Sequence, residues 1–166
     1  VNEDKQEILG WIERDRNLLI NFLSRFIQAR TPNPPGDTRE AMQHIRAALD
    51  DEFFDYQIID PKPEFPNLVA SFDGASADKH LVLNGHIDVF PVSDHETWDY
   101  GPWSGALADG KIWGRGAADM KCGTTASIFT YRYLHSLRDK LKGRLTLTCV
   151  SDEETFGPYG ARYLME

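Results

Sequence analysis

Histidine and carboxylate side chains occur at three places in the sequence where an apolar run and a polar segment meet. The first place holds His86 and Asp88, the second holds Asp119, and the third holds Asp152, Glu153 and Glu154. Imidazole nitrogens and carboxylate oxygens are ligands that zinc accepts in proteins, and a nearby glutamate can take and return a proton. These residue types favour a site that holds a divalent metal ion and moves a proton.

Each of these places also has a simpler explanation. The first fits a polar strand end, the second fits a helix N-cap made by Asp119, and the third fits a solvated acidic loop. If the acids converge, however, each close pair of carboxylates costs about 1 to 4 kcal/mol in repulsion, and bound dications remove that cost. The combination therefore indicates a metal site more strongly than any single place does. One metal ion held by His86, Asp88 and Asp119 stays open as an alternative.

Helical and strand-like segments alternate along the chain and position these residues. Apolar residues at helical spacing predict one or two helices within residues 8–27, which the proline-rich segment 31–36 must end. Asp37 followed by Glu40 resembles a capping box. Further helices are predicted over residues 38–53, 120–137 and 159–165.

Strands are predicted over residues 54–59, 67–72, 80–88 and 144–150, and Asp109-Gly110 marks a hairpin turn within residues 106–113. The continuous apolar run Leu81-Val82-Leu83 predicts a central strand that is buried on both faces. This alternation predicts an α/β fold: a three-layer arrangement with a mixed sheet and helices on both faces. In such folds, ligands bind beyond the carboxyl ends of the strands, which is where the acids and His86 fall.

Three segments around these residues resemble the motifs of one enzyme family. They are residues 84–91 (NGHIDVFP), residues 109–121 (DGKIWGRGAADMK) and residues 151–154 (SDEE) followed by Gly157. In this order and spacing they are similar to the co-catalytic zinc deacylase and peptidase family. That family includes acetylornithine deacetylase, succinyl-diaminopimelate desuccinylase, aminoacylase and glutamate carboxypeptidase.

The resemblance implies a role for each residue. His86 and Glu154 would each be a ligand of one Zn²⁺ ion, and Asp119 would bridge the two ions. Glu153 would be the general base, and Asp88 would orient His86. Co²⁺ or Mn²⁺ are the expected substitutes for Zn²⁺. The implied reaction is hydrolysis of an amide bond in a small N-acyl amino acid or peptide substrate. A cis peptide bond after Asp119 is implied as well.

Members of the family are more than twice as long as this chain. The resemblance therefore implies that residues 1–166 form part of a metallopeptidase-like catalytic domain, without its remainder and without the small dimerisation or lid domain. Two further ligands, a carboxylate and a histidine, are expected outside this sequence. We accordingly expect weak metal binding and little activity from the chain alone, and exposed apolar surface that favours a homo-oligomer. A non-catalytic binding module on the same fold stays open as the alternative function.

Composition limits the partners and the location of the protein. The net charge of −8 argues against nucleic acid and against anionic membrane surfaces. No apolar run approaches the roughly 20 residues that a transmembrane helix needs. The first residues lack the pattern of a signal peptide, and the two cysteines form no paired motif, so we expect a reducing, cytoplasmic compartment.

Overall fold

A four-stranded mixed sheet forms the centre of the computed structural model, which describes residues 3–50 and 54–166. The strands lie in the order β1 (Tyr56–Ile59), β2 (Asn67–Asp73), β6 (Lys142–Val150) and β3 (Ser76–His86). β2 pairs antiparallel with both β1 and β6, whereas β3 runs parallel to β6. The parallel pair brings the carboxyl ends of β3 and β6 to the same edge of the sheet.

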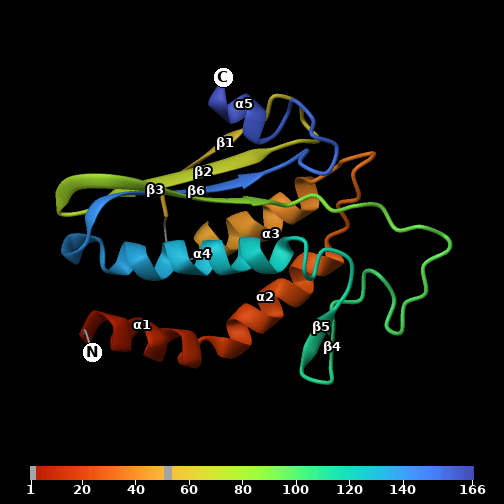
Figure 1. Ribbon diagram of the computed structural model, residues 1–166, viewed down its shortest axis with the longest axis horizontal. Helices are drawn as coiled ribbons and strands as arrows, with labels where there is room; N and C mark the ends of the chain where they lie inside the picture. The colour runs from red at the N-terminus through yellow and green to blue at the C-terminus, as the bar shows by residue number, and fades with distance from the viewer. Residues whose placement is uncertain (1–2, 51–53) are drawn as a thin grey trace.

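Helices cover the sheet unequally (Figure 1). The helices α1 (Glu3–Arg14), α2 (Arg16–Gln28), α3 (Arg39–Asp50) and α4 (Lys121–Ser136) lie on one side of it, and the short α5 (Ala161–Met165) lies on the other. A 3₁₀ turn, Arg138–Lys140, connects α4 to β6. The predicted three-layer α/β fold with a mixed sheet is therefore confirmed.

The core forms where α2, α3 and α4 pack beneath the sheet. Apolar residues spaced three and four apart give each of these helices a buried stripe, which excludes water against the apolar face of β2 and β6. Its fully buried members include Phe26, Ile45, Leu49, Leu68, Ile128 and Leu147.

The predicted helix boundaries are close to those observed. The segment predicted within residues 8–27 forms two helices that meet at Asp15, and the helix predicted over 120–137 is α4. The Asp37 carboxylate accepts a hydrogen bond from the backbone N–H of Arg39, at 3.1 Å, at the start of α3. The predicted end of that helix at residue 53 lies outside the described residues.

The predicted hairpin is confirmed as β4 (Ala106–Ala108) and β5 (Lys111–Trp113), which pair antiparallel. Asp109 and Gly110 both have positive φ, 54° and 70°, as a tight two-residue turn of this kind requires.

The prediction for Leu81-Val82-Leu83 is wrong in one respect. These residues lie in β3, which is an edge strand of the described sheet, and Leu81 and Val82 are 55% and 49% exposed. A continuous apolar run favours a strand that is buried on both faces, but whether the strand is central or at the edge depends on which other strands pair with it.

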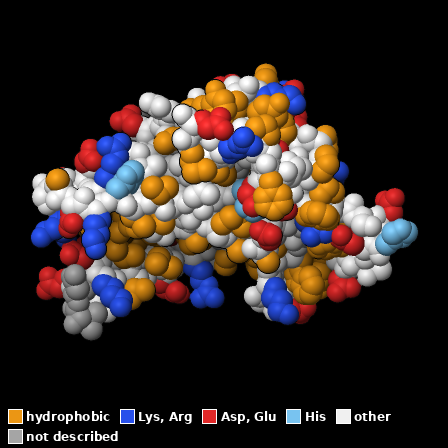
Figure 2. Space-filling view, turned by 45° about the horizontal axis from the view of Figure 1, so that its top comes forward, with side chains coloured by type: hydrophobic (Ala, Val, Ile, Leu, Met, Phe, Trp, Pro, Cys, Tyr) orange, Lys and Arg blue, Asp and Glu red, His pale blue; other side chains and the backbone are white. Residues whose placement is uncertain are grey.

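Apolar side chains are exposed in a second area as well. Figure 2 shows them gathered at the top of the molecule, where α5 lies, and Phe156, Tyr163 and Met165 are among the exposed hydrophobic residues of this part of the chain. Exposed apolar surface of this kind is the basis on which we expect self-association. Among the described helices, none has the length and apolar character to cross a membrane.

Candidate metal centre

The three groups of polar residues meet at the carboxyl ends of β3 and β6. His86 is the last residue of β3 and lies opposite Val150, the last residue of β6. Asp88 follows β3 by two residues, and Glu153 and Glu154 lie in the turn that follows β6. Because the two strands are parallel neighbours, residues distant in sequence leave the sheet side by side.

The His86 imidazole is the centre of this group. Its Nε2 atom lies 3.2 Å from Asp119 Oδ1 and 3.6 Å from Glu153 Oε2. His86, Glu153 and Glu154 offer ligand atoms that all lie within 4.8 Å of one another. His86 is buried, whereas the side chains of Asp119 and Glu153 are 78% and 46% exposed, so the carboxylates face the outside of the fold.

The other imidazole nitrogen, Nδ1, fixes the orientation of the ring. It lies 2.9 Å from the backbone oxygen of Asp88 and 3.5 Å from the Asp88 carboxylate. A carbonyl oxygen can only accept, so Nδ1 carries the proton and donates it. In the neutral ring, Nε2 then holds the lone pair and points it at the carboxylates. This is the tautomer that a metal-ligating histidine uses.

The Asp88 carboxylate is fully buried and ties the two strand ends together. It accepts hydrogen bonds from the backbone N–H groups of Glu153, at 3.2 Å, and Glu154, at 3.0 Å. Burial alone would raise its pKa, but these bonds, with those from His86 and Asn33, hold the Asp88 pKa below its ordinary value. Asp88 is therefore an ionised carboxylate inside the fold.

The electrostatics of the group show an excess of negative charge. Burial works against the charged form of His86, but the hydrogen bonds with Asp88 and the nearby Glu153 outweigh it and raise the His86 pKa to about 9. Burial raises the pKa of Glu154, and the negative charge of Asp119 adds to that effect. Both shifts have the direction expected where carboxylates lack enough positive charge.

Asp119 reaches the group from the segment before α4. The helix begins at Lys121, and Met120 occupies the N-cap position without a side-chain cap, so the simpler explanation of Asp119 as an N-cap is wrong. The Asp119–Met120 peptide bond is cis, as expected. α4 can approach the end of β3 closely because residue 85 is glycine: a Cβ there would collide with Thr124, whose hydroxyl donates to the His86 carbonyl.

Sequence comparison decides the family. A family model described as Peptidase family M20/M25/M40 matches residues 82–166, more than half of the chain. The chain belongs to this family. The match begins in β3 and includes all five residues that meet at the strand ends.

Curated relatives of this M20/M25/M40 chain include an N-formyl-4-amino-5-aminomethyl-2-methylpyrimidine deformylase from Halalkalibacterium halodurans. It is 34% identical over 152 residues, covering 90% of the chain and 36% of the relative. A succinyl-diaminopimelate desuccinylase from Wolbachia pipientis is 30% identical, covering 89% of the chain and 34% of the relative. The chain thus spans about a third of the length of these relatives.

Solved structures share the fold of the M20/M25/M40 chain. Human carnosine dipeptidase 1 superimposes with a TM-score of 0.76 at 20% identity, covering 96% of this chain and 37% of that protein. A Bacillus subtilis protein described as a dinuclear metal-binding peptidase of the M20 family gives a TM-score of 0.64 at 22% identity, covering 92% of this chain and 39% of that protein.

The residues of the M20/M25/M40 chain fit a divalent cation. They provide an oriented imidazole nitrogen and carboxylate oxygens, which are the ligands that zinc accepts. The His86 pKa is raised to about 9 and the Glu154 pKa is raised by burial and by the charge of Asp119, so a bound cation would compete with protons at these ligands.

Two residues of this region have supporting roles that the sequence patterns do not predict. Asn33, in the proline-rich segment 31–36, lies beside Asp88, and Asp152 anchors the turn that carries Glu153 and Glu154. Asp152 has a positive φ of 64°, and a Cβ at residue 157 would collide with its carboxylate, so Gly157 is required there. No periodicity indicates such roles, because contacts between distant loops create them.

The long loop after β3 is fixed to the segment before α4. Arg115 donates to both carboxylate oxygens of Glu96, at 2.7 and 2.8 Å, and stacks over the ring of Trp98. The backbone N–H of Phe90, at the start of this loop, donates to Glu154 Oε1 at 2.9 Å. The loop therefore holds one glutamate of the group in place.

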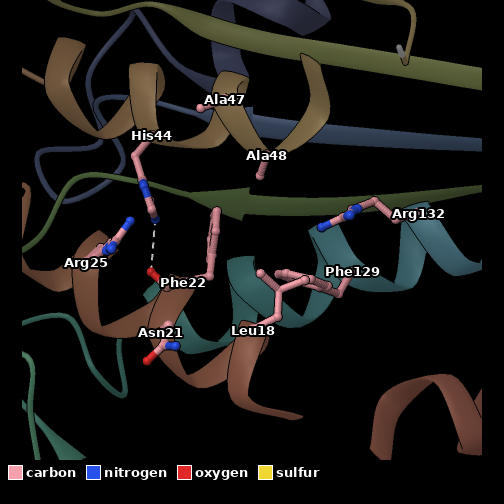
Figure 3. A pocket seen from close by; sticks show the side chains of 9 residues that line it. All are labelled: Leu18, Asn21, Phe22, Arg25, His44, Ala47, Ala48, Phe129 and Arg132. Carbon is pink, nitrogen blue, oxygen red and sulfur yellow. Dashed lines mark hydrogen bonds between the residues drawn. The ribbon is translucent and has the colours of Figure 1, made fainter. Parts of the chain in front are cut away.

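A separate cavity of about 240 Å³ lies away from this group, between α2, α3 and α4 (Figure 3). Phe22 and Phe129 contribute apolar surface to it, and Arg25 and Arg132 also line it. His44 donates through Nε2 to the Phe22 carbonyl at 2.9 Å and stacks on the Phe22 ring. These contacts give His44 a structural role in the packing of α2 against α3.

Proposed function

We propose that the protein is a metal-dependent hydrolase that cleaves amide bonds of N-acyl amino acids or small peptides. The observation that carries the proposal is the convergence of an oriented imidazole and three carboxylates at the carboxyl ends of β3 and β6. The chain spans about a third of the length of its curated relatives. The activity is therefore proposed for the full-length protein.

In this proposal His86, Asp119 and Glu154 would hold the Zn²⁺ ions. Co²⁺ or Mn²⁺ would serve as substitutes, since all three ions accept nitrogen and oxygen ligands. Two observations support the assignment of His86: its Nε2 faces the carboxylates, and its Nδ1 is held by Asp88. The Asp119 carboxylate lies 3.2 Å from His86 Nε2 and is accessible to solvent, which supports its role as a metal ligand.

When bound, the ions would supply Lewis-acid chemistry that lowers the pKa of water and stabilises negative charge on a carbonyl oxygen. Glu153 accepts the proton of the attacking water and delivers it to the nitrogen of the leaving amine. Its side chain is half-exposed, and its Oε2 lies 3.6 Å from His86 Nε2, so it faces both the ligands and incoming substrate. Asp88 keeps the imidazole in its ligating tautomer.

The names of the two curated relatives support the substrate class. A deformylase and a desuccinylase each remove an acyl group, and each covers close to nine-tenths of this chain. We therefore propose an acyl group on an amine nitrogen as the bond to be tested first, with dipeptides as the second class.

The test compares the wild-type protein with Glu153→Gln. Hydrolysis of N-formyl, N-succinyl and N-acetyl amino acids and of dipeptides is measured after zinc loading. We expect kcat to fall about 10²- to 10⁴-fold in Glu153→Gln, because the proton acceptor is lost, while zinc content stays the same. Glu13→Gln, at an exposed glutamate of α1, is the matched control and should turn over normally. Wild-type turnover in Glu153→Gln would sink the assignment.

A further inference from the structure

The backbone of the segment before α3 is fixed to the segment that follows β3. The N–H of Asn33 donates to the Val89 carbonyl, and the N–H of Val89 donates to the Thr31 carbonyl, both at 2.9 Å. The Thr31 hydroxyl adds a bond of 2.7 Å to the Ile87 carbonyl. These bonds leave the backbone of Asn33 little freedom, so its side chain has a defined place behind the metal centre.

The Asn33 side chain bridges two buried carboxylates. Its Nδ2 lies 2.8 Å from Asp88 Oδ2 and 3.1 Å from Asp152 Oδ1. Asn33, Asp88 and Asp152 are 3%, 0% and 4% exposed, so water does not screen the two charges from each other. Ionised carboxylates only accept, and therefore the NH₂ group of the amide, with its two donors, must face them.

The two carboxylates hold different parts of the centre. The Asp88 carboxylate lies 3.5 Å from His86 Nδ1 and accepts from the backbone N–H groups of Glu153 and Glu154. Asp152 accepts from the Thr155 hydroxyl at 2.8 Å and from the Tyr159 N–H at 3.1 Å, which orders the turn that carries the glutamates. A donor shared between them joins the histidine side of the centre to the glutamate side.

We propose that Asn33 is a positioning residue that sets the spacing between His86 and the pair Glu153–Glu154. It offsets the repulsion between Asp88 and Asp152 and holds both carboxylates at one nitrogen. The expected effect of Asn33 on metal affinity rests on the proposed function. Its expected effect on the turn that carries Glu153 and Glu154 does not.

Two variants separate this role from simple packing. Asn33→Asp keeps the shape of the side chain but replaces the two donors with a third carboxylate, and Asn33→Ala removes the group altogether. A packing role predicts that Asn33→Asp resembles the wild type and that Asn33→Ala is worse. A bridging role predicts that Asn33→Asp is worse than Asn33→Ala, since a third carboxylate would repel those of Asp88 and Asp152 at close range. Asn33→Ser, which keeps one hydroxyl donor, should lie between the wild type and Asn33→Ala.

The first measurement is amide hydrogen exchange at Glu153 and Glu154 in metal-free protein at neutral pH. We expect exchange about tenfold faster in Asn33→Ala, and faster again in Asn33→Asp, because loosening Asp88 weakens the bonds that these N–H groups make. The second is titration with Co²⁺, followed by its visible absorption. We expect the Co²⁺ affinity of Asn33→Ala and Asn33→Asp to be about 10- to 100-fold lower than that of the wild type, as is typical when a residue that orients a metal ligand is changed.

Thr146→Ala is the control. Thr146 is also buried, and its hydroxyl bonds Ser71 and His80 within the sheet, so its loss destabilises the fold without touching Asp88 or Asp152. Exchange at Glu153 and Glu154 should then match the wild type. Wild-type exchange and wild-type Co²⁺ affinity in Asn33→Asp would overturn the proposal. If the full-length wild-type protein binds no Co²⁺, the metal centre is refuted, while the exchange measurement still decides the role of Asn33.

Discussion

Two histidines of this chain lie in contrasting regions. His86, at the carboxyl ends of β3 and β6, faces carboxylates on both sides of its ring, and its pKa is raised to about 9. His44, in the cavity between α2, α3 and α4, stacks on Phe22 and lies near Arg25 (Figure 3). Burial and the charges of Arg25 and Lys121 lower the His44 pKa, although its bond to the Phe22 carbonyl favours the charged form.

The difference shows that burial alone does not decide the state of a histidine. Burial works against the charged form at both places, but at His86 the surrounding acids outweigh it. The strand ends concentrate negative charge that a cation would neutralise, whereas the cavity between the helices offers apolar contacts and positive charge. A metal centre is therefore expected in the first region and a packing role in the second.

The largest expected effect on stability is at Asp88. Asp88→Asn removes the charge to which His86, Asn33 and two backbone N–H groups are arranged, and we expect unfolding free energy to fall by about 3 to 5 kcal/mol. The His86 pKa should also fall toward its ordinary value. Urea unfolding and an NMR titration of the histidine ring measure the two effects.

Asp37→Asn is the control for this change. Asp37 pairs with Arg39 at the surface, and the loss should stay within about 1 kcal/mol. An equally small loss in Asp88→Asn would show that the strand ends are not organised around this charge, and the contrast between the two regions would disappear.

The next effect is on the pH dependence of stability in metal-free protein. The pKa of His86 is higher in the folded chain than its ordinary 6.5. Its contribution to the free energy of unfolding is therefore fully present below pH 6.5 and is lost as pH rises through about 9. The pKa of His44 is lowered, so its contribution is present above pH 6.5 and is lost as pH falls through its folded value.

Substitution of each histidine by glutamine tests these signs. His86→Gln should flatten the stability curve between pH 6.5 and 9, by on the order of 1 to 2 kcal/mol after allowance for solvent screening. His44→Gln should flatten it below pH 6.5 instead. If both variants change the stability curve on the same side of pH 6.5, the contrast between the two histidines is refuted.

The smallest expected effect is at Arg25. Arg25→Gln removes a positive charge that lowers the His44 pKa, so that pKa should move upward toward its ordinary value while that of His86 stays unchanged. Stability should change by no more than about 0.5 kcal/mol, as for most surface substitutions. Arg16→Gln, at an exposed position of the same helix, is the control and should move neither histidine. A shift at His86 instead would mean that the two regions are electrically coupled.

Much of the fold was predictable from local patterns. The 3.6-residue spacing of α2 and α4, the Asp109-Gly110 turn and the apolar strands β2 and β6 are local consequences of residue order, and each was predicted close to its observed bounds. β3 was predicted as a strand but not as an edge strand, because its sequence contains no information about which strands lie beside it.

The sequence by itself determined which side chains were available for chemistry. The types and order of His86, Asp88, Asp119, Glu153 and Glu154, and the family motifs around them, are properties of the chain alone. Only the tertiary structure decided that Asn33 and Asp152 support them and that the Asp88 carbonyl fixes the His86 ring. The physical reason is that hydrogen bonds and charge interactions depend on distances of a few ångströms between residues far apart in the chain. The parallel pairing of β3 with β6 sets those distances.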